Sequence, residues 1–112
     1  MLIAVVTSGT EGLDDVLPEF CGQAPYVTLV EVIDDKVRVK EVIKNPSQDF
    51  SYGKGPILVK ELKERGVDAL ICPEMGYSVK KLLIEQGISF FLIDKGTKVK
   101  DAVDIFLRKF RS

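Results

Sequence analysis

Turn-forming residues divide this chain more clearly than any other feature of its sequence. All five prolines and seven of the nine glycines fall in four stretches, at residues 8–25, 45–56, 72–76 and 94–97. Apolar and amphipathic runs lie between these stretches. Since glycine and proline interrupt helices and strands, the four stretches predict the main loops, and the runs between them predict the secondary structure that the chain can form.

The first half of the chain is predicted to form mainly β-structure. Leu2–Thr7 is apolar and β-branched without alternation, which is typical of a central strand buried on both faces. Tyr26–Ile33 and Lys36–Lys44 are separated by the short acidic turn Asp34-Asp35, which predicts a β-hairpin. The second of these strands alternates, so it should expose one face. Its predicted apolar side consists of Val37, Val39 and Val42.

The second half of the chain alternates helices with strands. Two further apolar strands are predicted at Val67–Cys72 and Ile88–Ile93. Three segments with an amphipathic pattern are predicted to be helices. The first runs from Pro56 to the C-cap Gly66, and the second from Ser78 to Gln86, before the C-cap Gly87. The third begins after the N-cap Thr97 and has an apolar stripe of Val99, Val103, Phe106 and Phe110.

The order of these elements is a strand, a β-hairpin and then αβαβα. It predicts an α/β fold, a sandwich of the ribonuclease H-like type in which a five-stranded mixed sheet has helices on both faces. Residues 1–112 should form a single domain. In this topology only the second strand runs opposite to the other four, so the Gly- and Pro-rich stretches meet at one edge of the sheet. Ligands in open α/β sheets bind at such an edge.

Composition excludes several classes of function. Sixteen basic and seventeen acidic residues give a net charge of −1, which leaves no excess positive charge for a nucleic-acid partner. The apolar run Met1–Val6 follows no basic region and is too short for a signal peptide or a membrane span, so no membrane partner is expected. Two cysteines do not make a disulfide framework, and the expected location is the reducing cytoplasm. Histidine, the commonest metal ligand, is absent.

Glycine-rich loops provide the first candidate site residues. Ser8-Gly9-Thr10-Glu11-Gly12 and Gly53-Lys54-Gly55 could bring backbone amides to an anion, the second with a cation beside it. Neither loop matches a phosphate-loop or dinucleotide fingerprint. Ordinary turns explain each loop taken alone, whereas seven glycines at one edge favour a shared binding site. The acidic residues of these stretches either face that site or form solvated surface. The four considered as site-facing are Asp14, Asp15, Glu19 and Glu74.

The two cysteines are the candidate soft ligands of the chain. Cys72 ends an apolar strand, where a buried and inert thiol is the usual role. Cys21 lies in a Gly-flanked loop, where we expect an accessible thiol, and structural and functional roles are equally open for it. Two thiols cannot complete a tetrahedral zinc site. They could anchor a soft metal cluster that brings its own ligands or is shared between subunits.

One segment resembles a known family motif. Pro18-Glu19-Phe20-Cys21-Gly22-Gln23-Ala24-Pro25-Tyr26 is similar to the Glu-His-Phe-Gly-Arg-Ala-Pro-Tyr motif of the dinitrogenase iron-molybdenum cofactor biosynthesis family, the NifX-like proteins. The resemblance extends over nearly the whole chain through Asn45-Pro46 with Gly53 and Gly55, Gly66-Val67-Asp68, Glu74-Met75-Gly76, Gly87-Ile88 and Gly96-Thr97. It implies a ribonuclease H-like fold and a non-catalytic protein that carries an iron-sulfur or iron-molybdenum-type cofactor or its precursor. It also implies protein partners in cofactor assembly.

Departures from the family motif change the expected ligand. Phe20 stands at the family's histidine, Cys21 at its phenylalanine and Gln23 at its arginine, and the histidine of the later Gly-rich loop is replaced near Tyr52. With the imidazole ligands absent, we expect Cys21 and then Cys72 to bind metal. The expected cofactor-binding residues are Ser8, Gly9, Cys21, Gly22, Gly53, Gly55 and Gly76.

Two other functions can be weighed against a carrier. A metal-free module that binds a small anion or regulates a partner requires only Ser8, Thr10, Lys54 and backbone amides. A nuclease of the ribonuclease H type would hold two metal ions with carboxylates, the first on strand 1, but Leu2–Thr7 contains none. Enzyme activity is therefore not expected, and the anion-binding module is the alternative to the carrier.

Overall fold

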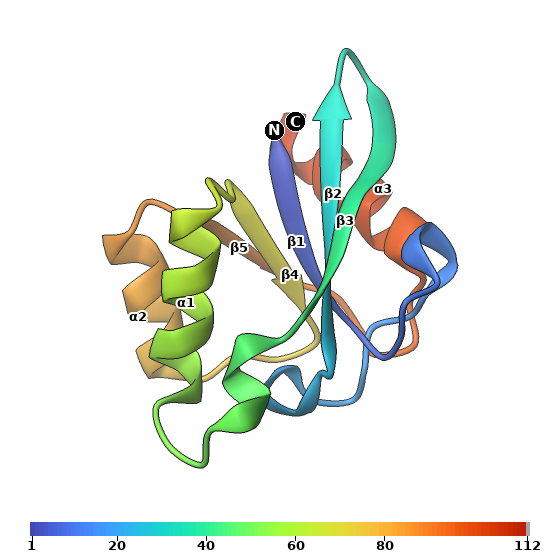
Figure 1. Ribbon diagram of the computed structural model, residues 1–112. Helices are drawn as coiled ribbons and strands as arrows, with labels where there is room; N and C mark the ends of the chain where they lie inside the picture. The colour runs from blue at the N-terminus through green and yellow to red at the C-terminus, as the bar shows by residue number, and fades with distance from the viewer. Residues whose placement is uncertain (112) are drawn as a thin grey trace.

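The computed structural model describes residues 1–111, which form a five-stranded mixed sheet with three α-helices (Figure 1). The strands are β1 (Leu2–Thr7), β2 (Tyr26–Ile33), β3 (Lys36–Lys44), β4 (Ala69–Cys72) and β5 (Ser89–Leu92), in the sheet order β3-β2-β1-β4-β5. β2 pairs antiparallel with β1 and β3, whereas β1, β4 and β5 pair in parallel. This confirms the predicted topology. The ribonuclease H-like label stays a prediction.

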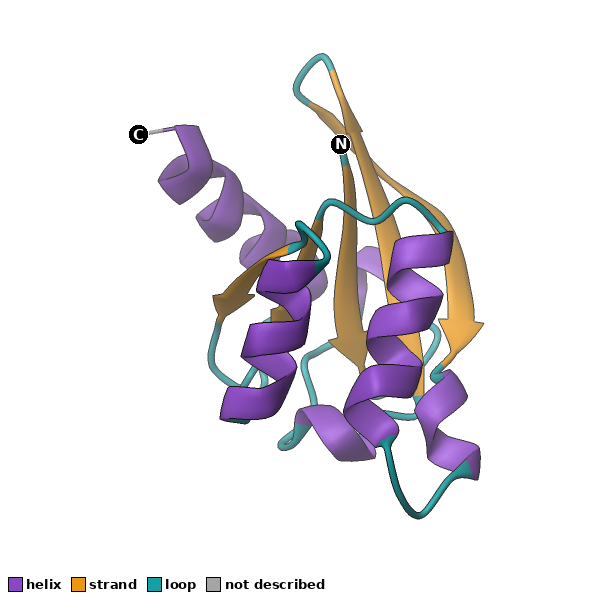
Figure 2. Cartoon of the chain, turned by 90° about the vertical axis from the view of Figure 1, so that its left-hand side faces the viewer, coloured by secondary structure: helices purple, strands orange, loops and turns teal. Residues whose placement is uncertain are grey.

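Helices cover both faces of the sheet (Figure 2). α1 (Lys54–Glu64) and α2 (Tyr77–Glu85) pack on one face, and α3 (Val99–Arg111) packs on the other. β1 is apolar from Leu2 to Val6 because its side chains enter both cores in turn. Ala4 and Val6 join the core under α1 and α2, while Ile3 and Val5 join the core under α3. None of the helices in residues 1–111 is long and apolar enough to cross a membrane.

The β2–β3 hairpin follows from its local sequence. Asp34 and Asp35 both have positive φ, as the type I′ turn of a tight hairpin requires. The strand register shifts between Leu29 and Val30, which leaves Lys40 as the extra residue of a bulge in β3. Because of this bulge, Val42 lies on the same face of β3 as Val37 and Val39 in spite of its irregular spacing.

Several predicted boundaries differ from the structure by one or two residues. α1 begins at Lys54 rather than Pro56, since Gly53 adopts φ +67° as the N-cap and Pro56 fits within the first turn. β4 and β5 are shorter than their apolar runs. In α3 the predicted apolar stripe ends early: Phe110 is 57% exposed and stacks on Phe106 near the end of the helix.

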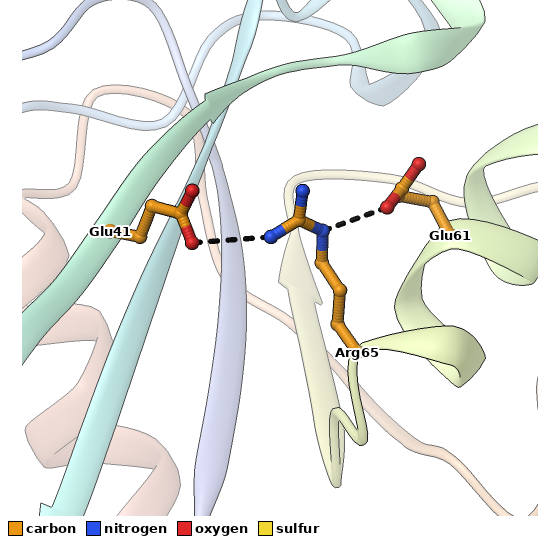
Figure 3. Close-up of polar contacts among 3 residues, drawn as sticks. All are labelled: Glu41, Glu61 and Arg65. Carbon is orange, nitrogen blue, oxygen red and sulfur yellow. Dashed lines mark hydrogen bonds and ion pairs between the residues drawn. The ribbon is translucent and has the colours of Figure 1, made fainter.

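An arginine connects α1 to the edge strand β3 (Figure 3). The guanidinium of Arg65, directly after α1, donates through Nε to Glu61 Oε2 at 2.7 Å and through Nη1 to Glu41 Oε2 at 3.2 Å. Because the Arg65 side chain is one-third exposed, this connection contributes little to stability. It does bring α1 and β3 together at the edge opposite the candidate site.

The loops that were predicted to share one edge do so, at the bottom of Figure 1. The carboxyl ends of β1, β3, β4 and β5 and the start of β2 all lie there. The sequence patterns did not predict the three short 3-10 helices η1 (Gly12–Asp14), η2 (Cys21–Gln23) and η3 (Pro46–Asp49). η2 and η3 shape this edge, whereas η1 packs against α3 and β3.

Candidate cofactor-binding site

The two cysteines meet at this edge. Cys21 is the first residue of η2 and Cys72 is the last residue of β4, and both side chains pack in the same core cluster, close enough to interact. Both are free thiols. Cys72 is fully buried, as expected, but the predicted accessibility of Cys21 is wrong, because Cys21 is only 9% exposed. The turn of η2 folds Cys21 and Ala24 against the core under α1 and α2, and so the loop position does not expose the thiol.

The environment of Cys72 opposes loss of its proton. The hydrogen bond with the Cys21 thiol raises the pKa of Cys72 far above its ordinary value, and burial and the nearby Glu74 raise it further. Cys72 Sγ also donates to the backbone carbonyl of Glu74 at 3.3 Å. Cys72 therefore carries a proton at neutral pH, and only a metal soft enough to displace that proton can bind it.

A cavity of about 270 Å³ opens beside Cys21. Its walls come from η2, η3, the first turns of α1 and α2, and the segment after β4. The lining residues are Cys21, Gly22, Ser47, Lys54, Gly55, Leu58, Glu74, Met75, Gly76 and Val79. Of the residues that the sequence predicted for cofactor binding, this cavity brings together Cys21, Gly22, Gly55 and Gly76. Gly53 adjoins it through Lys54.

The glycines at the cavity differ in whether the fold requires them. A Cβ on Gly55 would lie 2.5 Å from Val79 Cγ2, so this glycine permits the close approach of α1 and α2. Gly53 needs its positive φ to start α1. Neither Gly22 nor Gly76 has a positive φ, and a Cβ added at either position would meet no atom within 4 Å. The fold itself therefore does not require glycine at these two positions, and their effect is to keep the cavity open.

The cavity favours negative charge in its ligand. α1 and α2 both begin at its wall, and the amides of a helix's first turn carry partial positive charge. Lys54 adds a full charge, and its Nζ lies 3.4 Å from the carbonyl oxygen of Gly22. The carboxylate of Glu74 is engaged locally, because Oε1 accepts a hydrogen bond from the backbone N–H of Cys21 at 2.9 Å.

The Ser8–Gly12 loop does not join this cavity. Ser8 and Gly9 follow β1, but the chain then turns into η1, which packs against α3 on the other side of the sheet (Figure 1). The amides of this loop already have a partner. Asp15 accepts hydrogen bonds from the backbone N–H groups of Gly9 at 3.1 Å and Glu11 at 2.8 Å. The predicted contribution of Ser8 and Gly9 to a shared pocket therefore has no geometric support.

Two side chains that hold the site together were not identified as such from the sequence. Glu74, weighed only as site-facing or solvated, connects the two cysteine segments through its side chain and its carbonyl. Asn45 is buried, donates from Nδ2 to Ala24 O at 3.0 Å and accepts through Oδ1 from Ser47 Oγ at 2.7 Å. Asn45 thus joins η3 to η2, the turn that positions Cys21. The Asn45-Pro46 pair was the one available signal.

A soft metal that arrives with its own ligands is the group that fits these residues. In the described residues, no three or more His, Cys, Asp or Glu side chains gather into a group that could hold a metal ion. Cys21 and Met75 nevertheless line one cavity, and Cys72 packs in the same core cluster as Cys21. Sulfur ligands select soft metals and iron-sulfur clusters. The residues therefore suit a transferable cluster better than a resident ion with a complete protein ligand set.

Comparison with known proteins identifies structural relatives. The apo form of the orange protein from Desulfovibrio gigas is similar with a TM-score of 0.84 and 28% identity, covering 96% of this chain and 88% of that chain. PH0822 has a TM-score of 0.78 and 20% identity, with coverage of 97% and 92%. A putative NifB protein from Thermotoga has a TM-score of 0.74 and 24% identity, with coverage of 96% and 87%. The last two demonstrate similarity of fold alone.

Sequence comparison gives the family. No curated protein matches the chain. The model of one protein family, described as dinitrogenase iron-molybdenum cofactor, matches residues 1–109, which is nearly the whole chain. The match includes both cysteines, η2 and the first turns of α1 and α2. This chain belongs to the dinitrogenase iron-molybdenum cofactor family.

Proposed function

We propose that this protein is a non-catalytic carrier of an iron-sulfur or iron-molybdenum-type cluster or its precursor. The observation that supports this most directly is that Cys21 lines the cavity and lies close to Cys72 in the same core cluster. These are the two thiols that the chain possesses. Their meeting at the strand-end edge is what a sulfur-rich cargo would require. The carrier would act in the cytoplasm, where free thiols persist.

The rest of the cavity suits such a cargo. Iron-sulfur-type clusters carry negative charge and accept hydrogen bonds on their sulfides. The first-turn amides of α1 and α2 and the Lys54 ammonium supply donors and positive charge at the wall. Gly22 and Gly76 leave space beside the thiols. A cluster would be anchored through sulfur and held elsewhere by hydrogen bonds.

The number of protein ligands favours transfer over retention. Two cysteines leave the other metal sites of a cluster with ligands from solution or from a partner protein. Binding should therefore be weaker than in an electron-transfer protein, where four cysteines hold the cluster. Such weak binding is appropriate to a protein that delivers a cofactor to an assembly partner.

The anion-binding alternative has less support from the geometry. It requires Ser8 and Thr10 beside Lys54, but the Ser8–Gly12 loop lies away from the cavity and its amides bind Asp15. Lys54 and the two helix N-termini remain available to an anion, although Glu74 contributes a negative charge to the same wall. The alternative would be favoured if an anion bound while no metal did.

Anaerobic reconstitution tests the carrier proposal. Reduced protein is incubated with iron and sulfide, with and without molybdate, and then desalted. Metal per chain and the visible absorbance spectrum are measured. Wild type should retain metal and sulfide together with a charge-transfer absorbance, whereas Cys21→Ala and Cys72→Ala should each lose most of both, because each variant leaves one protein sulfur ligand.

Charge controls make this test specific. Lys54→Gln should reduce metal retention, while Lys81→Gln, which removes the same charge from an exposed position on α2, should not. Circular dichroism confirms that each variant is folded. Wild-type protein that retains no metal, or Cys21→Ala that retains as much as wild type, would require the carrier proposal to be abandoned in favour of anion binding.

A further inference from the structure

The proximity of the two cysteines in one core cluster permits a second reaction besides metal binding. We propose that Cys21 and Cys72 form a reversible dithiol–disulfide couple, and that its oxidation switches off cluster binding at the cavity. The second half of this proposal rests on the proposed carrier function. The first half concerns only the two cysteines and can be tested without any cargo.

The fold brings the two cysteine side chains close together. Cys21 and Cys72 are the two cysteines of the chain, and both are free thiols in one core cluster. Glu74 connects them, since its Oε1 accepts from the backbone N–H of Cys21 at 2.9 Å and its carbonyl accepts from Cys72 Sγ at 3.3 Å. A disulfide requires an S–S distance of about 2.05 Å, so the two sulfur atoms must move together and Cys72 must release the Glu74 carbonyl. Cys72 is fixed at the end of a central strand, whereas Cys21 starts a three-residue turn. The η2 turn is therefore the side that can move.

Unequal exposure assigns a separate role to each cysteine. Cys21 lines the cavity and is 9% exposed, whereas Cys72 does not line it and is 0% exposed. A small oxidant that enters the cavity therefore reaches Cys21 first. The cavity of about 270 Å³ admits hydrogen peroxide. Cys72, next to Cys21, then resolves the oxidised sulfur.

Hydrogen peroxide as the oxidant gives a balanced pair of steps. The deprotonated sulfur of Cys21 attacks one peroxide oxygen, the O–O bond breaks, and the departing hydroxide takes up a proton as water, leaving Cys21 as a sulfenic acid. The sulfur of Cys72 then attacks the sulfur of Cys21. The S–O bond breaks as the S–S bond forms, and hydroxide leaves with the thiol proton of Cys72 as a second water. A small thiol reductant reverses the result by thiol–disulfide exchange.

Oxidation would remove both sulfur ligands at once. A disulfide sulfur is neither an anion nor a strong metal ligand, since it is the thiolate that binds metal. The disulfide would also fix η2 to the end of β4. The same proximity that presents two ligands to a cluster in the reduced protein would close the site under oxidising conditions, before a labile cluster is exposed to the oxidant.

Intact mass spectrometry of cargo-free protein tests the couple. The reduced protein is treated with equimolar peroxide while folded, then denatured and alkylated. Wild type should lose the mass of two hydrogen atoms and change from two alkylatable thiols to none, and a thiol reductant should restore both. If folded wild type keeps two thiols, or if disulfides form only between chains or only in denaturant, the couple does not exist.

Single substitutions test the assigned roles. Cys72→Ser should accumulate a sulfenic acid at Cys21 that a dimedone-type probe traps. In Cys21→Ser, the buried Cys72 should resist peroxide in the folded state. Equal trapping in both variants would overturn the assignment. Circular dichroism before and after treatment verifies folding, and the mass change of wild type is decisive even if one variant is unstable.

Reconstitution of both redox forms separates this proposal from the carrier function. The reduced and the oxidised wild type are each incubated anaerobically with iron and sulfide. The expected result is metal retained by the reduced form and at least a tenfold smaller amount by the oxidised form. Equal retention in both forms would overturn the switch and leave the carrier function intact. If the reduced form binds nothing but the disulfide forms, the carrier function and the switch both fail, and the couple stands.

Discussion

A buried carboxylate holds the loop that follows β1. Asp15 is 6% exposed, and its oxygens accept hydrogen bonds from the backbone N–H groups of Gly9, Glu11 and Val16 at distances of 2.8 to 3.1 Å. Charge-assisted bonds of this kind are among the stronger hydrogen bonds in proteins. The close approach leaves no room for a side chain at Gly9, where a Cβ would lie 2.9 Å from Asp15 Oδ2.

Replacement of Asp15 should therefore destabilise the protein substantially. We expect Asp15→Ala to lower the free energy of unfolding by about 2 to 4 kcal/mol, because three backbone amides lose a charged acceptor. Asp14→Ala is the matched control: Asp14 is exposed and pairs only with the exposed Lys100 at 3.3 Å. Its loss should be about 0 to 1 kcal/mol. Urea denaturation measures both, and similar losses would contradict the anchoring role of Asp15.

At the level of single residues, the sequence could name candidate ligands but not the surroundings of their side chains. Residue type alone made Cys21 and Cys72 the candidate soft ligands, which stays a prediction, and loop position alone wrongly predicted an accessible Cys21. The sequence could not distinguish Asp14 from Asp15, because the hydrogen bonds that separate them depend on how the loop folds back. Nor could it bring Cys21 close to Cys72, since their two segments meet only through the tertiary fold.

Among the secondary structure elements, the approach of α1 to α2 shapes the cavity. Gly55 in the first turn of α1 faces Val79 in the first turn of α2, and both residues line the cavity. Any side chain at position 55 would have to displace Val79, whose β-branched side chain has little rotamer freedom. The spacing of the two helix N-termini therefore depends on one glycine.

A double-mutant cycle tests this dependence. Gly55→Ala should lower the free energy of unfolding by roughly 1 to 3 kcal/mol through overpacking, in spite of alanine's higher helix propensity. In the background of Val79→Ala, the same change should cost much less, because the clashing methyl groups are gone. Gly22→Ala, where the added Cβ meets no atom within 4 Å, is the control and should leave stability nearly unchanged. Additive losses at positions 55 and 79 would contradict the proposed contact.

The order and type of the long elements could be predicted, whereas the short ones could not. Apolar runs identified four of the strands, alternation and the acidic turn before it identified β3, and amphipathic spacing identified the three α-helices. The 3-10 turns η2 and η3 have no periodicity of their own. η3 depends on Asn45, whose Oδ1 accepts from the backbone N–H of Ser47 at 3.0 Å, and η2 depends on packing against the core. Since these turns form the cavity wall, its shape was the least predictable part.

At the scale of the whole molecule, the sheet separates two hydrophobic cores. The core under α1 and α2 includes Cys21 and Cys72 and adjoins the cavity. The core under α3 contains Phe106, which is 4% exposed and contacts the ring of Phe91 edge-on at a centroid distance of 5.9 Å. The second core includes none of the residues that line the cavity. Stability and binding should therefore respond to different substitutions.

Phe106→Ala provides the clearest test of this separation. Truncating a buried phenylalanine leaves a large cavity, so the free energy of unfolding should fall by about 3 to 5 kcal/mol. Phe110→Ala is the control, since Phe110 is 57% exposed and its truncation should cost at most about 1 kcal/mol. Urea denaturation measures these losses. Anaerobic reconstitution at a temperature where Phe106→Ala remains folded should give the same metal per folded chain as wild type, because the sheet lies between the altered core and the cysteine pair. If the folded variant loses its metal, the two faces are coupled through the sheet, and the cavity depends on the packing of α3.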